Sequence, residues 1–136
     1  ITLGFTLNVG CSPQLPPSKK ILNLIQKSKA DIHIHNSAAE AVKGADCVIT
    51  DTWVSMNNKN IRKRKRLLKP YQVDTRLMRI AKKNAIFMHC LPAHRGEEVT
   101  DSVIDGSRSL VWDEAENRLH AQKGIIAWCL SKNSRS

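Results

Sequence analysis

The chain has 136 residues and a formal net charge of +10, from 22 Lys and Arg against 12 Asp and Glu. Hydrophobic residues make up 41% and charged residues 25%, which excludes the disordered, collagen-like and disulfide-dense classes and indicates one ordinary globular domain. No apolar run approaches the roughly 18 residues of a membrane helix, and the first residues do not follow the order of a secretory signal peptide.

Short apolar runs alternate with helical patterns along the chain. In chain order, the predicted elements are a strand at 5–9, a helix that begins after Ser18, a strand at 31–35, a short helix at 38–43, a strand at 46–50, a basic helix at 60–68, a helix at 75–82, a strand at 85–89, a turn or short helix at 101–106, a strand at 109–112 and a helix at 113–130. This alternation predicts an α/β fold, doubly wound around a mostly parallel sheet.

Ligands of such folds bind at the carboxyl ends of the strands. Two segments with polar or reactive side chains follow predicted strands, at 51–56 and 89–95. Asp51 and Ser55 could bind a substrate amine, or could cap a helix. Cys90 lies beside imidazole and guanidinium groups, so it is either a thiol of lowered pKa, a ligand contact or a small packed side chain.

Two further features leave alternatives open. Arg118 could reach an anion at the sheet edge, or pair with Glu114 one helical turn earlier. Seven basic residues lie between Lys59 and Lys69, and elsewhere basic residues exceed acidic ones by only three. This run could bind phosphate backbones, but no aromatic residue is interleaved, which favours a solvated helix face.

The sequence predicts no metal site and no disulfide. His33 and His35 share a strand face without a third ligand nearby, which favours a solvated edge strand. The four cysteines are far apart and form no Cys-x-x-Cys pair, which is typical of reduced thiols in a cytoplasmic protein.

Three segments together resemble the C-terminal part of the ornithine carbamoyltransferase family. They are Asp-Thr-Trp-Val-Ser-Met at 51–56, His-Cys-Leu-Pro-Ala-His-Arg-Gly-Glu-Glu-Val at 89–99, and Val-Trp-Asp-Glu-Ala-Glu-Asn-Arg-Leu-His-Ala-Gln-Lys at 111–123. The resemblance is dense from about residue 45 to 130 and implies an incomplete Rossmann-like ornithine-binding domain. It also implies that the last helix packs back on an N-terminal carbamoyl-phosphate domain.

The resemblance implies a reaction, in which carbamoyl phosphate and L-ornithine give L-citrulline and phosphate without a cofactor or metal. Asp51 would hold the ornithine α-amino group, with Ser55 and Met56 along the ornithine backbone. Cys90 would lie against the δ-amine, Cys90 and Leu91 would bracket the carbamoyl group, and Arg118 would contact carbamoyl phosphate. The partners implied are these two substrates, with no nucleic acid or membrane, and the full-length enzyme is expected to be a cytoplasmic homotrimer.

This sequence departs from the family pattern in three ways. One is the basic segment at 59–66, where the family usually has an acidic or mixed one. Asn57 stands where the motif has Gly, in a loop that is a mobile lid in the family. The family's Ser-Thr-Arg-Thr-Arg and His-Pro-x-Gln motifs do not occur in the 136 residues, so we expect a fragment that is inactive alone. The alternatives are a carbamoyltransferase for another amine or an acylated ornithine, and a nucleic-acid-binding module that uses residues 59–69.

The resemblance also implies a gap in the sheet. In the family the first strand of this domain is central, and its counterpart would precede Ile1. The strands at 5–9 and 46–50 are therefore expected to flank an empty position instead of pairing with each other.

Overall fold

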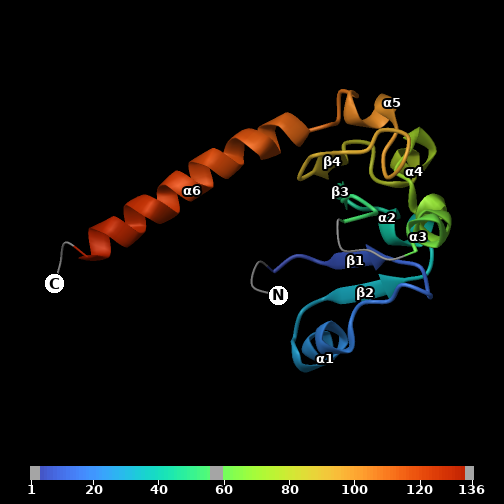
Figure 1. Cartoon of the computed structure of the whole chain (residues 1–136), viewed down its shortest axis with the longest axis horizontal. Coiled ribbons are helices and arrows are strands. Elements are labelled where there is room, and N and C mark those ends of the chain that lie inside the picture. The colour runs from blue at the N-terminus through green and yellow to red at the C-terminus, as the bar shows by residue number, and fades with distance from the viewer. Residues whose placement is uncertain (1–3, 56–59, 134–136) are drawn as a thin grey trace.

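The computed structural model describes residues 4–55 and 60–133 (Figure 1). Its strands are β1 (Leu7–Gly10), β2 (Ile32–His35), β3 (Cys47–Thr50) and β4 (Ile86–His89). Its helices are α1 (Lys19–Lys27), α2 (Ala38–Val42), α3 (Ile61–Leu68), the 3-10 turn η1 (Lys69–Tyr71), α4 (Thr75–Ile80), α5 (Asp101–Ile104) and α6 (Val111–Asn133). This alternation of strands and helices is the predicted α/β class.

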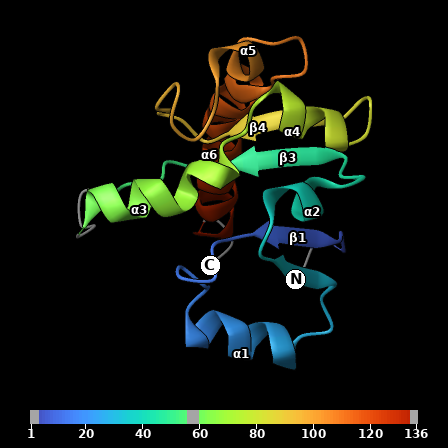
Figure 2. The ribbon, with the colours of Figure 1, turned by 90° about the vertical axis from the view of Figure 1, so that its right-hand side faces the viewer.

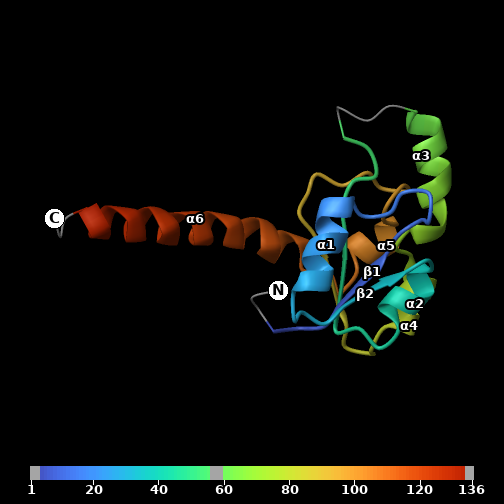
Figure 3. The same ribbon diagram turned by 90° about the horizontal axis from the view of Figure 1, so that it is seen from below.

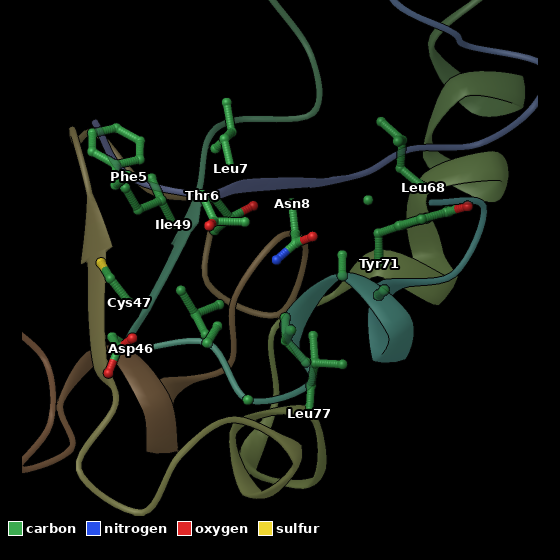
Figure 4. A pocket seen from close by; sticks show the side chains of 18 of the residues that line it. Phe5, Thr6, Leu7, Asn8, Asp46, Cys47, Ile49, Leu68, Tyr71 and Leu77 are labelled. Carbon is green, nitrogen blue, oxygen red and sulfur yellow. The ribbon is translucent and has the colours of Figure 1, made fainter. Parts of the chain in front are cut away.

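The strands form two separate parallel pairs. β1 pairs with β2, with Leu7 opposite Ile32, and β3 pairs with β4, with Thr50 opposite His89. Within the described residues β1 and β3 are not hydrogen-bonded to each other, which confirms the expected gap. A cavity of about 790 Å³ lies there, lined by both strands and by side chains such as Tyr71 and Leu77 (Figure 4).

Backbone groups of both strands point into this cavity. Leu7 N donates to Asp31 O and Cys11 N to His35 O, so the odd-numbered residues of β1 face β2. Ile86 N donates to Asp46 O, so the even-numbered residues of β3 face β4. Because consecutive residues of a strand bond to opposite sides, Asn8 and Cys47 direct their peptide groups into the gap.

The predicted strand at 109–112 is wrong. Ser109 forms one isolated parallel bridge with Phe87, and Leu110 N donates to Phe87 O at 2.9 Å. The chain then turns into α6 at Val111, whose first turn carries Asp113 and Glu114. Carboxylates near a helix N-terminus favour the helix, and a four-residue apolar run cannot by itself distinguish a strand from a helix start.

The hydrophobic core surrounds only the second strand pair. Its fully buried members include Ala85, Phe87, Val99 and Val111, with Met78 of α4 at 2% exposure. Among the described residues, none that precedes Val42 belongs to this cluster. α2 lies between the two strand pairs and joins the β1–β2 layer to the rest (Figure 2).

Helix α6 extends away from the body of the molecule (Figures 1 and 3). Its first residue, Val111, is fully buried, and the N-terminal end of the helix contacts β4. From Ala115 to Ser131 every side chain is exposed. No helix in the described part of the chain is both long and apolar enough to cross a membrane.

Candidate functional site

Asp51 and Cys90 meet at the carboxyl ends of β3 and β4. Because Thr50 is in register with His89, the next residue of each strand emerges at the same edge. Cys90 Sγ donates a hydrogen bond to Asp51 Oδ1 at 3.4 Å. Both side chains are exposed, so a ligand can approach them from solvent.

The two groups differ in charge. A hydrogen bond from Thr52 N, at 2.7 Å, is the main cause that lowers the pKa of the Asp51 carboxyl. Partial burial opposes it, and the hydrogen bond from Cys90 lowers the pKa further. Partial burial raises the pKa of the Cys90 thiol, and the hydrogen bond to Asp51 raises it further. The pair is therefore a carboxylate beside a neutral thiol near pH 7, which corrects the option of a thiol with a lowered pKa. Such a pair can bind an ammonium group.

A buried histidine and glutamate lie behind Cys90. Consecutive side chains of a strand point to opposite faces, so His89 faces the core while Cys90 faces solvent. His89 and Glu98 are both fully buried, with His89 Nε2 3.3 Å from Glu98 Oε1. His89 Nδ1 accepts a hydrogen bond from Leu91 N at 2.9 Å, which fixes the turn that carries Cys90 and Leu91.

The loop from Leu91 to Val99 folds back along the strand end. Leu91 has a φ of 51°, in the left-handed region, and its half-buried side chain packs on the core. Glu98 Oε1 accepts from His94 N at 2.5 Å, and Gly96 N donates to Val99 O at 2.8 Å. These bonds hold the loop that follows Cys90 and Leu91, and the role predicted for Leu91 stays a prediction.

The segment after β3 is anchored by the basic helix. Trp53 is 6% exposed, and its carbonyl oxygen accepts a hydrogen bond from Arg64 Nε at 2.5 Å. Lys65 pairs with Glu97, which lies in the loop from Leu91 to Val99. Two cations of the basic run therefore hold the segments that follow Asp51 and Cys90, which is a structural use of the run.

The other predicted site residues are Ser55, Met56 and Arg118. Ser55 is exposed at the end of the described part of the loop, and Met56 and Asn57 lie outside the described residues. Arg118 is exposed on α6, and within the described chain no hydrogen bond or ion pair joins it to Asp51, Cys90 or Glu114. The roles predicted for Ser55, Met56 and Arg118 stay predictions.

The two histidines of β2 contact neighbouring polar side chains. His33 contacts Asp31 at 2.7 Å and His35 contacts Asn8 at 3.0 Å. Within the described ranges, no group of three His, Cys, Asp or Glu side chains is placed to hold a metal ion.

Sequence reasoning missed the buried His89–Glu98 pair and the Arg64 anchor. The strand period was a usable signal for His89, since it places His89 on the same face as Phe87. Glu98 and Arg64 gave no such signal, because a glutamate in a loop and an arginine in a basic run are normally solvated.

The chain is similar to a known family over almost its whole length. The model of the aspartate/ornithine carbamoyltransferase Asp/Orn binding domain matches residues 1–129. The ornithine carbamoyltransferase of Rhodopseudomonas palustris CGA009 is 65% identical over 126 residues, which are 93% of this chain and 41% of that protein. That of Agrobacterium fabrum is 52% identical over 127 residues, or 42% of its length. The chain thus spans about two fifths of the curated relatives that it matches.

Solved structures show the same likeness. The anabolic ornithine carbamoyltransferase of Campylobacter jejuni has a TM-score of 0.87 at 32% identity, over 96% of this chain and 45% of that one. The enzyme of Pyrococcus furiosus has a TM-score of 0.78 at 42% identity, over 90% and 41%.

Proposed function

The chain belongs to the aspartate/ornithine carbamoyltransferase family, and on this basis we propose that it is the ornithine-binding part of an ornithine carbamoyltransferase. The whole enzyme would transfer the carbamoyl group of carbamoyl phosphate to the δ-amine of L-ornithine. The observation that carries the proposal is the contact between Asp51 and Cys90 at the open end of β3 and β4. A carboxylate and a neutral thiol at one edge suit a substrate that has two amino groups.

In the proposed mechanism Asp51 pairs with the α-ammonium group of ornithine. Its lowered pKa keeps the carboxylate charged at neutral pH, and a charge-assisted hydrogen bond to an ammonium is strong. Ser55 and Met56 would line the backbone-facing side of the bound amino acid. Putrescine keeps both amino groups of ornithine and lacks only its α-carboxylate, so a choice between the two requires a group that recognises that carboxylate, not Asp51.

Cys90 and Leu91 would act at the reacting atoms. The δ-amine, once deprotonated, gives its electron pair to the carbamoyl carbon, the bond from that carbon to the phosphate oxygen breaks, and phosphate leaves with the electron pair. The amine loses one proton as the new C–N bond forms, and the leaving phosphate accepts that proton. Cys90 remains a neutral thiol beside the amine and adds no negative charge to a site that must bind an anionic donor. Arg118 would offset the charge on the donor.

The architecture proposed for the whole enzyme follows from the family. Residues 1–136 would be part of its C-terminal ornithine-binding domain, and α6 would pack on an N-terminal domain that binds most of carbamoyl phosphate. The enzyme would be a cytoplasmic homotrimer that needs no metal or organic cofactor.

A segment exchange tests the proposal. The 126 residues of this chain that align with the Rhodopseudomonas palustris relative, at 65% identity, replace the matching segment of that protein. We expect the hybrid to form citrulline from ornithine and carbamoyl phosphate. A folded hybrid that forms only carbamoylputrescine from putrescine, or a carbamoylated acyl-ornithine, would contradict it.

Single substitutions in the same hybrid test the site. Cys90→Ala should lower kcat, since Cys90 is placed at the reacting atoms, while Cys47→Ala should leave it nearly unchanged. Cys47 makes a suitable control because it lies at the opposite end of β3 from Asp51. Equal effects of the two substitutions would reduce Cys90 to a packing residue.

A further inference from the structure

Helix α3 and the first residue of η1 carry four exposed cations: Arg62, Lys63, Arg66 and Lys69. Arg62, Arg66 and Lys69 have the spacing i, i+4 and i+7, which places them along one side of the helix over a rise of about 10 Å. Lys63 lies one helical turn before Arg66 and widens this line. These four residues are called the α3 cation row below.

The α3 cation row has little structural use in the described part of the chain. Three of its members make no hydrogen bond or ion pair there, and Lys69 donates to the neutral side chain of Gln72 at 3.1 Å. The two cations that hold neighbouring segments, Arg64 and Lys65, are less exposed and belong to other sides of α3. The row is therefore available to a ligand.

No nearby acidic residue of the sequence compensates the charge of the row. The sequence has no Asp or Glu from 52 to 73, and Glu97 already pairs with Lys65. Arg62 and Arg66 are one helical turn apart, and like charges at this spacing repel each other. Because basic residues exceed acidic ones by only three outside 59–69, the excess of positive charge is local. An anion with several charges in a line would offset the repulsion.

The chemistry of the row favours phosphate groups. Two of its four members are arginines, whose guanidinium groups donate two parallel hydrogen bonds to a phosphate. A lipid surface would also require apolar side chains beside the cations. Among residues 61–68, Ile61 is the one large apolar side chain that is exposed.

Aromatic side chains are not available beside the row. None occurs from 61 to 69, Trp53 is buried, and the half-buried Tyr71 donates its hydroxyl hydrogen bond to Asn36 O. Binding of single-stranded nucleic acids depends on the stacking of bases on aromatic rings. Contacts with phosphates alone suit a duplex, and they carry no information about base sequence.

We propose that the α3 cation row binds the phosphate backbone of a nucleic-acid duplex without reading its sequence. This binding departs from the expectation of no nucleic-acid partner, which the resemblance implied. Helix α3 lies on the opposite side of the body from the projecting end of α6, so the packing proposed for α6 uses a different part of the surface (Figures 1 and 3). The inference does not depend on the proposed function.

The first test is the salt dependence of binding. A short labelled DNA duplex is titrated with the purified 136-residue chain at several sodium chloride concentrations, and fluorescence anisotropy gives the association constant. Its logarithm should fall linearly with the logarithm of the salt concentration, with a slope of about −3 to −4 for four neutralised phosphates. Absence of binding at low salt, or a flat slope, would overturn the proposal.

The second test locates the binding surface. Arg62→Gln combined with Arg66→Gln should reduce the magnitude of the slope by about two, since each lost phosphate contact changes it by about one. Lys19→Gln combined with Lys20→Gln is the matched control, because it removes the same charge from exposed positions of α1 and should leave the slope nearly unchanged. Equal effects of the two double variants would mean that binding follows net charge alone, which would refute the assignment to α3.

A charge-conserving variant guards against a folding defect. Arg62→Lys combined with Arg66→Lys keeps both positive charges, so the salt slope should stay close to that of the unaltered chain. A loss of slope as large as that of the glutamine variant would show that the two positions act through the fold and not through charge, against the proposal.

The third test identifies the polyanion. The duplex should bind more tightly than either of its separate strands at the same salt concentration, and a second duplex of unrelated sequence should bind equally well. Vesicles of phosphatidylcholine and phosphatidylserine provide the lipid arm. Tighter binding of a single strand, or binding of the vesicles without binding of the duplex, would contradict the assignment to a duplex.

Discussion

The acidity of Cys90 depends on the charge of Asp51, because the thiol donates its hydrogen bond to that carboxylate. Asp51→Asn removes the negative charge and leaves partial burial as the main cause of the raised pKa, so the pKa should fall. The fraction of thiolate at a given pH then rises, by up to about tenfold for each pKa unit. Alkylation of Cys90 by iodoacetamide at pH 8 should therefore become several-fold faster.

Cys129 is the internal control for this measurement. Cys129 is an exposed thiol on α6, whereas Asp51 follows β3. Its alkylation rate should therefore be the same in the unaltered chain and in the Asp51→Asn variant. An unchanged or slower rate at Cys90 in the Asp51→Asn variant would show that the carboxylate does not control the thiol.

For Asp51 and Cys90, sequence patterns predicted the positions but not the protonation states. Asp51 and Cys90 could be placed together because each follows a buried strand, and parallel strands end at one edge. The protonation of the thiol could not be predicted, since the neighbouring His94 and Arg95 suggested a positive surrounding. In the structure Arg95 is bound to Asp101 and Asp105, so it does not supply that charge to the thiol.

The short helices α2 and α4 differ in the hydrogen bonds of their N-cap residues. Asp74 accepts a hydrogen bond from Leu77 N at 2.8 Å at the start of α4, whereas the Ser37 side chain makes no such bond at α2. Asp74→Ala should therefore lower the free energy of unfolding by about 1 kcal/mol, a typical value for loss of a cap. Urea titration of the two alanine variants would measure this.

The Ser37→Ala variant serves as the comparison. Ser37 has the same position relative to its helix but contributes no side-chain hydrogen bond to the backbone, so its loss should cost clearly less than that of Asp74. The comparison would fail if the two variants unfolded at the same urea concentration.

Element types were predictable where a pattern extended over several turns or was bounded by turn residues. The strands at 5–9 and 85–89 and the helix after Ser18 are of this kind. The segment 109–112 was not, because its apolar residues serve two purposes: Leu110 bonds to Phe87, and Val111 already fills the core as the first residue of α6. Burial at a helix start looks like burial in a strand when only sequence is read.

For the whole molecule, the main expectation is that residues 1–136 alone form no citrulline. Beyond the residues at the strand ends, the resemblance assigns contact with carbamoyl phosphate to Arg118. This residue lies exposed on α6. The resemblance assigns most contacts with carbamoyl phosphate to the Ser-Thr-Arg-Thr-Arg and His-Pro-x-Gln motifs, and neither occurs in the 136 residues. A colorimetric citrulline assay of the purified chain, with the hybrid enzyme as positive control, would measure this, and turnover by the chain alone would refute it.

The division of the sheet into two unconnected pairs has a consequence for how the molecule opens. In the described residues up to Asn36 only Ser12 is buried, and the β1–β2 layer is held chiefly by α2, with a hydrogen bond from Tyr71 Oη to Asn36 O. This layer should therefore detach by sub-global fluctuations while the core around Phe87 stays intact. In native-state hydrogen exchange, the amides of β1 and β2 should exchange much faster than those of β4, and with little dependence on urea. Uniform protection across both strand pairs would instead mean that the molecule opens only as a single cooperative unit.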